Sequence, residues 1–379
     1  MRAMRRLAVM LICVGTVVGG PVIRPAAATP ARHVPVFAYF YQWYERSSWQ
    51  RAKQDHPLAG DYSSDDPHVL RDQIQEARAA GIDGFLTSWK HTPPLDRRLE
   101  LLLTIAASEH FAVGVVYQGL DFSRAPLPIT TVERDMKYLV DRWGAALRSS
   151  YFNRPVVIWT GTDQFSLPDV RAVRGALGRR AYLLAAAKSV EGYQRVAAQV
   201  DGEAYNWSSA NPRSPSTGTK LAAMSATVHR NRGIWLAPAA PGFDGRTLGH
   251  SRVISRDRGS TFRLSLDLAY ASRPDVVGVI SWNEWSENTY IEPGHRYRGE
   301  EVRVVRDYLA ARAPGAPAAD GPAKAPDAAS GWSGLKAAVV LTITCCVGMI
   351  LLLLLPHRPR RRATHAHPRD RRELTNSSN

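Results

Sequence analysis

Two glutamates, Glu284 and Glu287, stand three residues apart in the segment SWNEWSENTYIEP, residues 281–293. This segment continues an apolar run, Val276–Ser281, that is typical of a buried β-strand. Two carboxylates held close together push one pKa upward, so one group keeps a proton while the other is ionised. Glycosyl transfer needs such a pair, because one group protonates the leaving oxygen and the other assists attack. The sequence therefore predicts Glu284 and Glu287 as catalytic residues of a sugar-active enzyme.

The alternative is a solvated loop with two surface glutamates. Three aromatic residues that flank the pair and its position at a strand end count against that interpretation. Glu292, which precedes Pro293, is expected to have a supporting structural role.

Aromatic, amide and charged side chains also follow the other predicted strands. Sugar rings stack their C–H faces on aromatic rings, while sugar hydroxyls need planar polar partners. The alternative is that these aromatics only cap a core, and Trp235, inside its strand, is expected to do so. As a set they favour sugar binding, and the predicted substrate-binding residues are Tyr39, Tyr41, Trp43, Trp89, Lys90, Tyr117, Tyr205, Asn283, Trp285 and Tyr290.

Short apolar runs alternate with longer amphipathic stretches between residues 33 and 312. The runs predict strands at Val36–Tyr41, Gly84–Trp89, Val113–Tyr117, Val156–Trp159, Ala181–Ala185, Val200–Ala204, Gly233–Ala237 and Val276–Ser281. Helices are expected at Asp66–Ala80, Leu95–His110, Thr131–Arg148 and Ser260–Ser272. Eight strands alternating with helices predict an α/β fold, a (β/α)8 TIM barrel, with an open doubly wound sheet as the alternative. No glycine-rich nucleotide motif follows an early strand.

The 379 residues have a formal net charge of +15, which would suit a nucleic-acid-binding protein. Arginines are concentrated at both ends of the chain, however, beside apolar segments, and the body between them is only moderately basic. Such flanking charge sets membrane topology, so a nucleic-acid partner is not expected.

The N-terminal 28 residues have a basic start, a short apolar run and a terminal Ala-Ala-Ala, which predicts a cleaved signal peptide, with an uncleaved anchor as the alternative. After the barrel domain (33–312), an Ala/Pro/Gly-rich stretch (313–333) is expected to be a flexible stalk. Residues 337–355 are apolar enough to span a bilayer, and a basic tail (356–379) follows. We therefore expect a single-pass protein of the cell membrane with an extracytoplasmic catalytic domain and a cytoplasmic tail.

The three cysteines, Cys13, Cys345 and Cys346, all lie in the two apolar segments. The predicted exterior domain therefore has neither a disulfide nor a thiol nucleophile.

The strand-end segment resembles the signature W/F-N-E-W-x-E-G-T-x-[IL]-E-P of glycoside hydrolase family 99, the endo-α-1,2-mannosidases, and of the related WbsX-like proteins. The stretches YFYQWY (39–44), His56-Pro57, AGIDGF (80–85), PGFD (241–244) and RDRG (256–259) resemble the family over roughly residues 36 to 310. The resemblance adds His56 to the expected substrate-binding residues.

The resemblance implies a retaining mechanism in which the sugar's own 2-hydroxyl attacks the anomeric carbon. Glu284 would assist its deprotonation, and Glu287 would act as acid and then as base. The substrate implied is a polysaccharide or glycan, mannan-like, with no metal or cofactor. Ser286 and Asn288 depart from the family's His and Gly at these positions, which puts the mannose substrate in doubt. A glycosyltransferase and a non-catalytic glycan-binding barrel stay open as alternatives.

Overall fold

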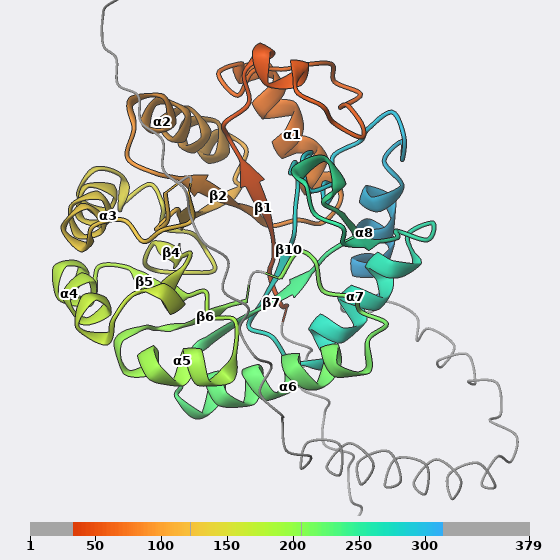
Figure 1. The fold of residues 1–379 in the computed structure, drawn as a ribbon. Coiled ribbons are helices and arrows are strands. Elements are labelled where there is room, and N and C mark those ends of the chain that lie inside the picture. The colour runs from red at the N-terminus through yellow and green to blue at the C-terminus, as the bar shows by residue number, and fades with distance from the viewer. Residues whose placement is uncertain (1–32, 122, 206, 314–379) are drawn as a thin grey trace, which may run out of the picture. The chain divides into compact units, whose positions relative to one another are not determined.

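The computed structural model describes residues 33–121, 123–205 and 207–313, which form a closed barrel of eight parallel strands. The strand order around the barrel is β1-β10-β7-β6-β5-β4-β3-β2, and Figure 1 shows the helices as a ring outside the strands. The first and last barrel strands pair directly, with Ala38 opposite Val279. The predicted (β/α)8 barrel is confirmed and the open sheet is excluded.

The barrel strands coincide closely with the predicted apolar runs. They are β1 (Val36–Tyr41), β2 (Gly84–Trp89), β3 (Ala112–Tyr117), β4 (Val156–Trp159), β5 (Tyr182–Ala185), β6 (Gly202–Ala204), β7 (Ile234–Ala239) and β10 (Val276–Val279). Parallel strands covered on both faces are apolar throughout, which is why they could be located from composition.

The helices that cover the barrel are α1 (Pro67–Ala79), α2 (Pro93–Ser108), α3 (Ile129–Trp143), α4 (Leu167–Leu177), α5 (Val190–Val196), α6 (Pro215–Arg230), α7 (Ser260–Ala271) and α8 (Glu300–Ala310). The side chain of Asp66 caps α1 by accepting a hydrogen bond from the His68 amide, and Gly81 follows its end with a φ of +83°. The helix expected at 131–148 was too long, because α3 ends before Gly144.

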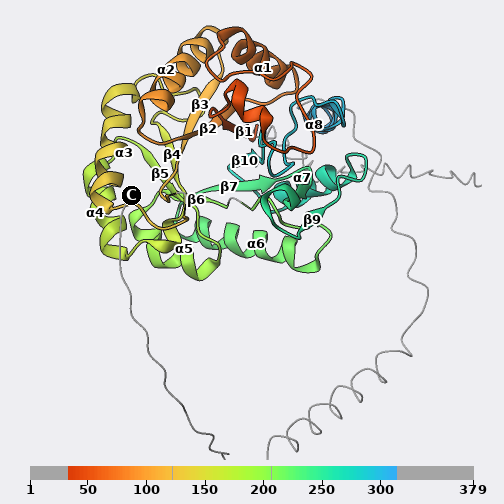
Figure 2. The same ribbon diagram turned by 45° about the horizontal axis from the view of Figure 1, so that its top comes forward.

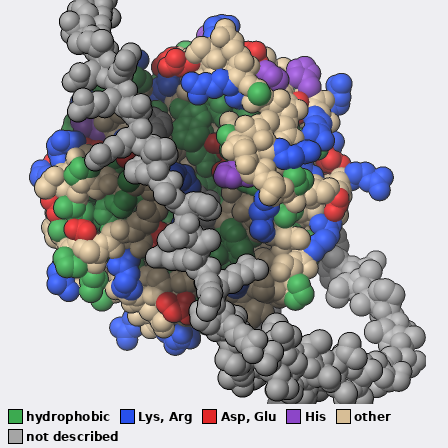
Figure 3. All heavy atoms as spheres, viewed as in Figure 1, with side chains coloured by type: hydrophobic (Ala, Val, Ile, Leu, Met, Phe, Trp, Pro, Cys, Tyr) green, Lys and Arg blue, Asp and Glu red, His purple; other side chains and the backbone are tan. Residues whose placement is uncertain are grey.

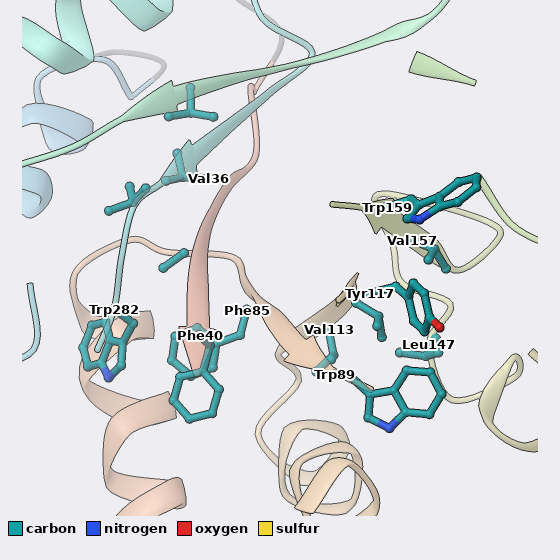
Figure 4. Close-up of a cluster of buried hydrophobic side chains, with 14 of the residues drawn as sticks. Val36, Phe40, Phe85, Trp89, Val113, Tyr117, Leu147, Val157, Trp159 and Trp282 are labelled. Atoms are coloured by element: carbon teal, nitrogen blue, oxygen red, sulfur yellow. The ribbon is translucent and has the colours of Figure 1, made fainter. Parts of the chain in front are cut away.

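Each barrel strand contributes apolar side chains to two layers, one inside the barrel and one between the strands and the helices. Alternate residues point into the barrel, as Phe37 and Tyr39 do, while Ala38 and Phe40 face the helices. The outer layer contains the largest rings, and Figure 4 shows Trp89, Trp159 and Trp282 there with Phe40, Phe85 and Tyr117. Trp235 is fully buried in this layer, and its indole N–H donates to the Ser272 hydroxyl at 2.8 Å, which confirms its structural role.

A two-stranded antiparallel hairpin that the sequence did not predict follows β7. It pairs β8 (Phe243–Asp244) with β9 (Val253–Ile254) around a short 3-10 turn, η4 (Arg246–Leu248). We call residues 243–254 the β8–β9 hairpin; Figure 2 shows β9 beside α7. A further 3-10 turn, η1 (Arg46–Gln50), follows β1.

The predicted signal peptide, stalk, membrane span and basic tail lie outside the described residues. Among the residues that are described, no helix is both long and apolar enough to cross a membrane.

Candidate active site

Glu284 and Glu287 lie in the loop that follows β10, at the C-terminal ends of the barrel strands. Glu284 is 7% exposed; its backbone N–H donates to the Ser281 hydroxyl at 2.7 Å, and its Oε1 accepts the Ser286 amide at 3.0 Å. Glu287 is half-buried and accepts a hydrogen bond from the Ser208 side chain. The loop thus fixes Glu284 through its own backbone, whereas Glu287 is reached by residues from other loops.

Both carboxyl groups have raised pKa values. Burial, and next the charge of Glu287, raise the pKa of Glu284 to about 8, against the opposing effects of the Ser286 amide and Lys53. Burial also raises the pKa of Glu287, but Ser208, Arg124 and His250 oppose that rise. In the free protein near neutral pH, Glu284 therefore keeps its proton, and the pKa of Glu287 also lies above the ordinary value of a glutamate.

Asn283 ties the start of this loop to the end of β1. Its Oδ1 accepts the Tyr41 amide at 2.7 Å, and its Nδ2 donates to the Tyr41 carbonyl at 2.9 Å. The Tyr44 hydroxyl donates to the Asn283 carbonyl at 2.7 Å. Asn283 is fully buried, and its side-chain amide holds β1 against the loop; its contact with substrate stays a prediction.

Five buried aromatic side chains form a cluster that includes two residues of this loop. They are Tyr44, Trp49, Tyr62, Trp285 and Tyr290. Trp285 and Tyr290 stack with ring centroids 3.8 Å apart, and the Tyr290 hydroxyl donates to Asp55. Neither ring exposes a face to solvent. Trp285 and Tyr290 thus pack on each other and on the other rings of this cluster, and their binding of substrate stays a prediction.

The carboxylate of Glu292 accepts hydrogen bonds from three side chains, two of which belong to this aromatic cluster. The Gln73 amide donates to it at 2.6 Å, the Tyr62 hydroxyl at 2.9 Å and the Trp285 indole at 3.1 Å. Burial raises its pKa to about 7 despite these bonds. These contacts agree with the supporting role expected for Glu292.

Arg256 anchors the far end of the loop. Its guanidinium donates to the carbonyls of Asn288 at 2.9 Å and Tyr290 at 2.7 Å, and it lies 3.4 Å from Glu301 of α8. Both ionic side chains of this pair are buried. The last helix is thereby connected to the loop that contains Glu284 and Glu287.

The β8–β9 hairpin contacts the same loop at Ser286 and Glu287. The Asp244 amide donates to the Glu287 carbonyl at 2.9 Å, and the Thr247 hydroxyl donates to the Ser286 carbonyl at 3.0 Å. Gln54, from the loop after β1, donates to the Asp244 carbonyl at 3.3 Å. Three loops that are distant in sequence therefore meet at Glu287.

The two departures from the family signature preserve the loop's backbone. Asn288 has a left-handed φ of +54°, a conformation that glycine adopts freely and asparagine tolerates better than most residues. Ser286 uses its amide and carbonyl, not its side chain, in the contacts with Glu284 and Thr247.

Four other residues that were predicted to contact sugar are buried, and the structure shows which groups their side chains contact. Trp89 and Tyr117 face the helices, where Trp89 donates to Asp96 at 3.0 Å and Tyr117 to Asp135 at 3.1 Å. Tyr39 points into the barrel core, where burial raises its pKa. Tyr205 packs on Trp207 and donates to the Lys188 carbonyl at 3.3 Å.

The remaining predicted contacts are at least partly accessible. Trp43 is 41% exposed and its ring lies 4.5 Å from that of Tyr41, whose pKa is raised first by burial and then by Glu284 and Glu287. His56 is paired with Asp61 at 2.8 Å, and the Lys90 ammonium donates to the Leu120 carbonyl at 3.0 Å. Tyr41 and Trp43 are thus the aromatic pair that a sugar beside the two glutamates could contact.

Sequence reasoning gave no role to several residues that act on the pair. Asp244 and Arg256 belong to stretches that resemble the family, and that likeness was the available signal. Lys53, Arg124, Ser208 and His250 lie in loops with no motif, and only the folded chain brings them to Glu284 and Glu287. No group of three or more His, Cys, Asp or Glu in the described ranges is arranged to hold a metal ion.

No family model matches this chain. It is 22% identical over 283 residues to a glycoprotein endo-alpha-1,2-mannosidase-like protein of Mus musculus, covering 67% of this chain and 61% of the relative. It is also 22% identical over 270 residues to the protein of that name from Danio rerio, covering 64% and 59%. The chain thus spans about three fifths of the length of these relatives.

The fold is similar to that of the GH99 endo-alpha-mannosidase from Bacteroides thetaiotaomicron, with a TM-score of 0.63 and 17% identity over 74% of this chain and 99% of that one. A structure described as a glycoside hydrolase-like protein aligns with a TM-score of 0.56 and 13% identity over 75% and 97%. The resemblance seen in the strand-end motif is thus accompanied by similarity in sequence to endo-alpha-1,2-mannosidase-like proteins and by similarity in fold to a GH99 endo-alpha-mannosidase.

Proposed function

We propose that the protein is a glycoside hydrolase that cleaves α-linked glycans, mannan-like ones first among them, with retention of configuration. The observation that carries this proposal is the pair Glu284 and Glu287, held in the loop after β10 at the C-terminal ends of the barrel strands, with both pKa values raised. The printed names of the relatives, endo-alpha-1,2-mannosidase-like proteins, support the same substrate class.

In this proposal Glu284 takes the proton of the 2-hydroxyl while that oxygen attacks the anomeric carbon. Glu287 gives its proton to the glycosidic oxygen, so the leaving sugar departs as an alcohol. Water then opens the resulting three-membered ring at the anomeric carbon, Glu287 accepts the proton of the water, and Glu284 returns its proton to the 2-oxygen. Glu284 holds a proton in the free protein near neutral pH, and it has to lose that proton before it can accept the one from the 2-hydroxyl.

We further propose, from the sequence alone, that the barrel is exported and tethered to the membrane. The apolar segment at 337–355, with the basic tail after it, supports a single-pass anchor.

The direct test is product analysis. The full chain, purified in detergent, is incubated with a panel of α-linked mannans and glucans, and the first product is followed by NMR of its anomeric proton. Release of α-configured product from an α-linked substrate supports a retaining hydrolase. Initial release of β-configured product would overturn retention, and tight binding without cleavage would identify a glycan-binding barrel.

A further inference from the structure

The N-terminal end of the barrel is the end opposite the glutamate pair, where loops lead from a helix into the next strand. Four of these loops contain an exposed arginine whose guanidinium forms no hydrogen bond or ion pair with another described residue: Arg148 before β4, Arg179 before β5, Arg232 before β7 and Arg273 before β10. Because β4 pairs with β5 and β7 with β10, the four arginines lie in two pairs of neighbouring loops. The Arg154 guanidinium joins the first two loops by donating to the Arg179 carbonyl at 3.1 Å.

Three aspartates of the loops at this end are bound to backbone groups. Asp83, Asp201 and Asp275 accept amide hydrogen bonds at 2.7, 2.8 and 2.9 Å from residues at the starts of neighbouring strands, which are Val36, Leu183 and Trp235. Within the described ranges, their ion pairs are with His33, Arg174 and His229, and none is with the four arginines. These aspartates therefore hold the strands together and leave the arginines without a neutralising partner.

Two grooves at the N-terminal end bring further basic side chains together. The first has a volume of about 810 Å³ and apolar walls that include Phe111 and Leu309, and its basic lining residues are His33, Arg78, His110, Arg306 and Arg312. The second has a volume of about 570 Å³ and is lined by His229, Arg230 and Arg273. Of the described residues that line the two grooves, Asp83 is the one that is acidic. An anion at this end would therefore meet several cations and a single carboxylate that is already bound.

Three of these cations stand in a strained backbone conformation. His110, Arg232 and Arg273 follow the ends of α2, α6 and α7 with φ values of +51°, +56° and +55°, whereas Gly81 follows α1 with a φ of +83°. This left-handed region favours glycine, and the attraction of a cation to a helix C-terminus offsets only part of the strain. The helix ends alone therefore do not account for the cations in these loops.

Both ends of the described chain lie beside the first groove, since His33 and Ala313 are among its lining residues. Residues 314–336 separate Ala313 from the apolar segment 337–355 that is proposed to span the membrane. In the view of Figure 3, lysine and arginine side chains lie mostly toward the rim of the molecule and not around the central hollow. The end of the barrel from which the chain continues to the proposed span is thus the end with the unneutralised arginines.

We propose that the N-terminal end of the barrel binds the surface of an anionic phospholipid bilayer, with the exposed arginines against the lipid phosphates. This inference rests on the membrane tether of the proposed function. Basic side chains close to a membrane anchor are attracted by anionic lipids, and the guanidinium group forms charge-assisted hydrogen bonds with phosphate. In this orientation Glu284 and Glu287, at the opposite end, face away from the bilayer and stay open to glycans.

The test uses the full chain reconstituted into vesicles of phosphatidylcholine alone or of phosphatidylcholine with phosphatidylglycerol. Phenylglyoxal modifies accessible arginines, and mass spectrometry gives the rate at each position. Modification of Arg148, Arg179, Arg232 and Arg273 should be at least about fivefold slower on the anionic vesicles, since one basic residue near such a surface contributes about that factor in affinity. About 1 M NaCl should remove the protection, because it shortens the screening length to about 3 Å.

Exposed arginines at the other end of the barrel supply the controls. Arg51 and Arg124, in the loops after β1 and β3, should be modified at the same rate on both kinds of vesicle. The double variant Arg232→Gln/Arg273→Gln should lose most of the protection of Arg148 and Arg179. The matched double variant Arg51→Gln/Arg124→Gln should keep it.

Equal modification of the four arginines on both kinds of vesicle would overturn the inference. So would protection by a dissolved acidic polysaccharide with none by the anionic vesicles, which would identify a polysaccharide as the partner of this surface. Flotation of the protein with the phosphatidylcholine vesicles measures the proposed tether separately. A chain that does not float with them lacks the anchor, and the arginine rates on the anionic vesicles then decide the binding of the barrel end by themselves.

Discussion

The backbone amide of Asp244 donates a hydrogen bond to the carbonyl oxygen of Glu287 at 2.9 Å. The proposed acid is therefore positioned by a hairpin that follows β7, and not by its own loop alone. Glu284, by contrast, is fixed by Ser281 and Ser286 of the same loop. The two carboxylates thus have separate supports, which allows their roles to be tested separately.

Glutamine at each position should distinguish the two roles. Glu287→Gln keeps the shape of the side chain but delivers no proton, so activity should fall by about 10²–10⁴-fold on glycans with poor leaving groups. The defect should shrink with an activated leaving group, because such a group needs less protonation. Glu284→Gln should stay defective with both kinds of substrate, because attack by the 2-hydroxyl is needed in each. Kinetics with aryl and glycan substrates check this.

Parent-like turnover by both glutamine variants would contradict the assignment. Another carboxylate, such as Asp163 or Glu203, would then have to act. Glycan binding by both variants is the control for a folded site.

The raised pKa of Glu284 predicts a specific pH dependence of stability. Its folded pKa of about 8 lies above the ordinary value of 4.5, so between these values the folded state holds a proton that the unfolded state has lost. Stability contributed by this group is therefore lost as pH rises, by about 1.4 kcal/mol for each pH unit between the two pKa values. Glu284→Gln does not titrate, so its Tm relative to the parent should increase from pH 5 to pH 8.

Calorimetric scans across that range measure the effect. Glu100→Gln, at an exposed site on α2, is the control and should keep a nearly constant Tm difference. If the Tm difference between Glu284→Gln and the parent stays constant or decreases as pH rises, burial does not keep this carboxyl protonated.

Arg256 is expected to be a structural requirement of the loop. Arg256→Met leaves the Asn288 and Tyr290 carbonyls without their donor and Glu301 buried without its counter-charge. Breaking a buried ion pair by removing one partner costs about 3–5 kcal/mol, and we expect a loss of that size in the free energy of unfolding measured with urea. Arg306→Met, at an exposed position of α8, should change it by less than about 0.5 kcal/mol. Similar losses in the two variants would exclude the anchoring role.

Substitution by alanine should weaken glycan binding at Trp43 and lower the stability of the fold at Trp89. Trp43 is 41% exposed beside Tyr41, so Trp43→Ala should weaken glycan binding several-fold, as expected for a lost stacking contact of about 0.5–1.5 kcal/mol, with little change in Tm. Trp89 is fully buried against the helices, so Trp89→Ala should cost about 3–5 kcal/mol of stability. Affinity of the folded fraction for glycan should stay at the parent value. Loss of binding in Trp89→Ala without loss of stability would restore its predicted sugar contact.

The membrane topology expected from the sequence is tested by protease added to intact cells. The barrel should be digested, and a small fragment with the basic tail should be protected, because positively charged tails stay on the cytoplasmic side. Lysed cells are the control for accessibility. A barrel that survives in intact cells and is lost only after lysis would place it on the inside.

The sequence by itself located the eight strands and the glutamate pair. Strands covered on both faces are apolar along their whole length, so runs such as Gly84–Trp89 stand out without an alignment. The cap at Asp66 and the stop at Gly81 also depend on local backbone chemistry, which the sequence contains in full. The two glutamates were found because their spacing and their position after a strand are local features as well.

Only the tertiary structure decided which way each strand residue points and what surrounds Glu287. Successive side chains of a strand point to opposite faces, but in a strand that is apolar on both faces the sequence does not show which residues face inward. Trp89 and Tyr117 could therefore not be assigned to the helix-facing layer, or Tyr39 to the barrel interior. The hydrogen bonds of Glu287 with Ser208 and with Asp244 of the β8–β9 hairpin join loops from different parts of the chain. Those contacts exist because β10 closes the barrel against β1 and brings the ends of all eight strands to one face, and no local pattern records that closure.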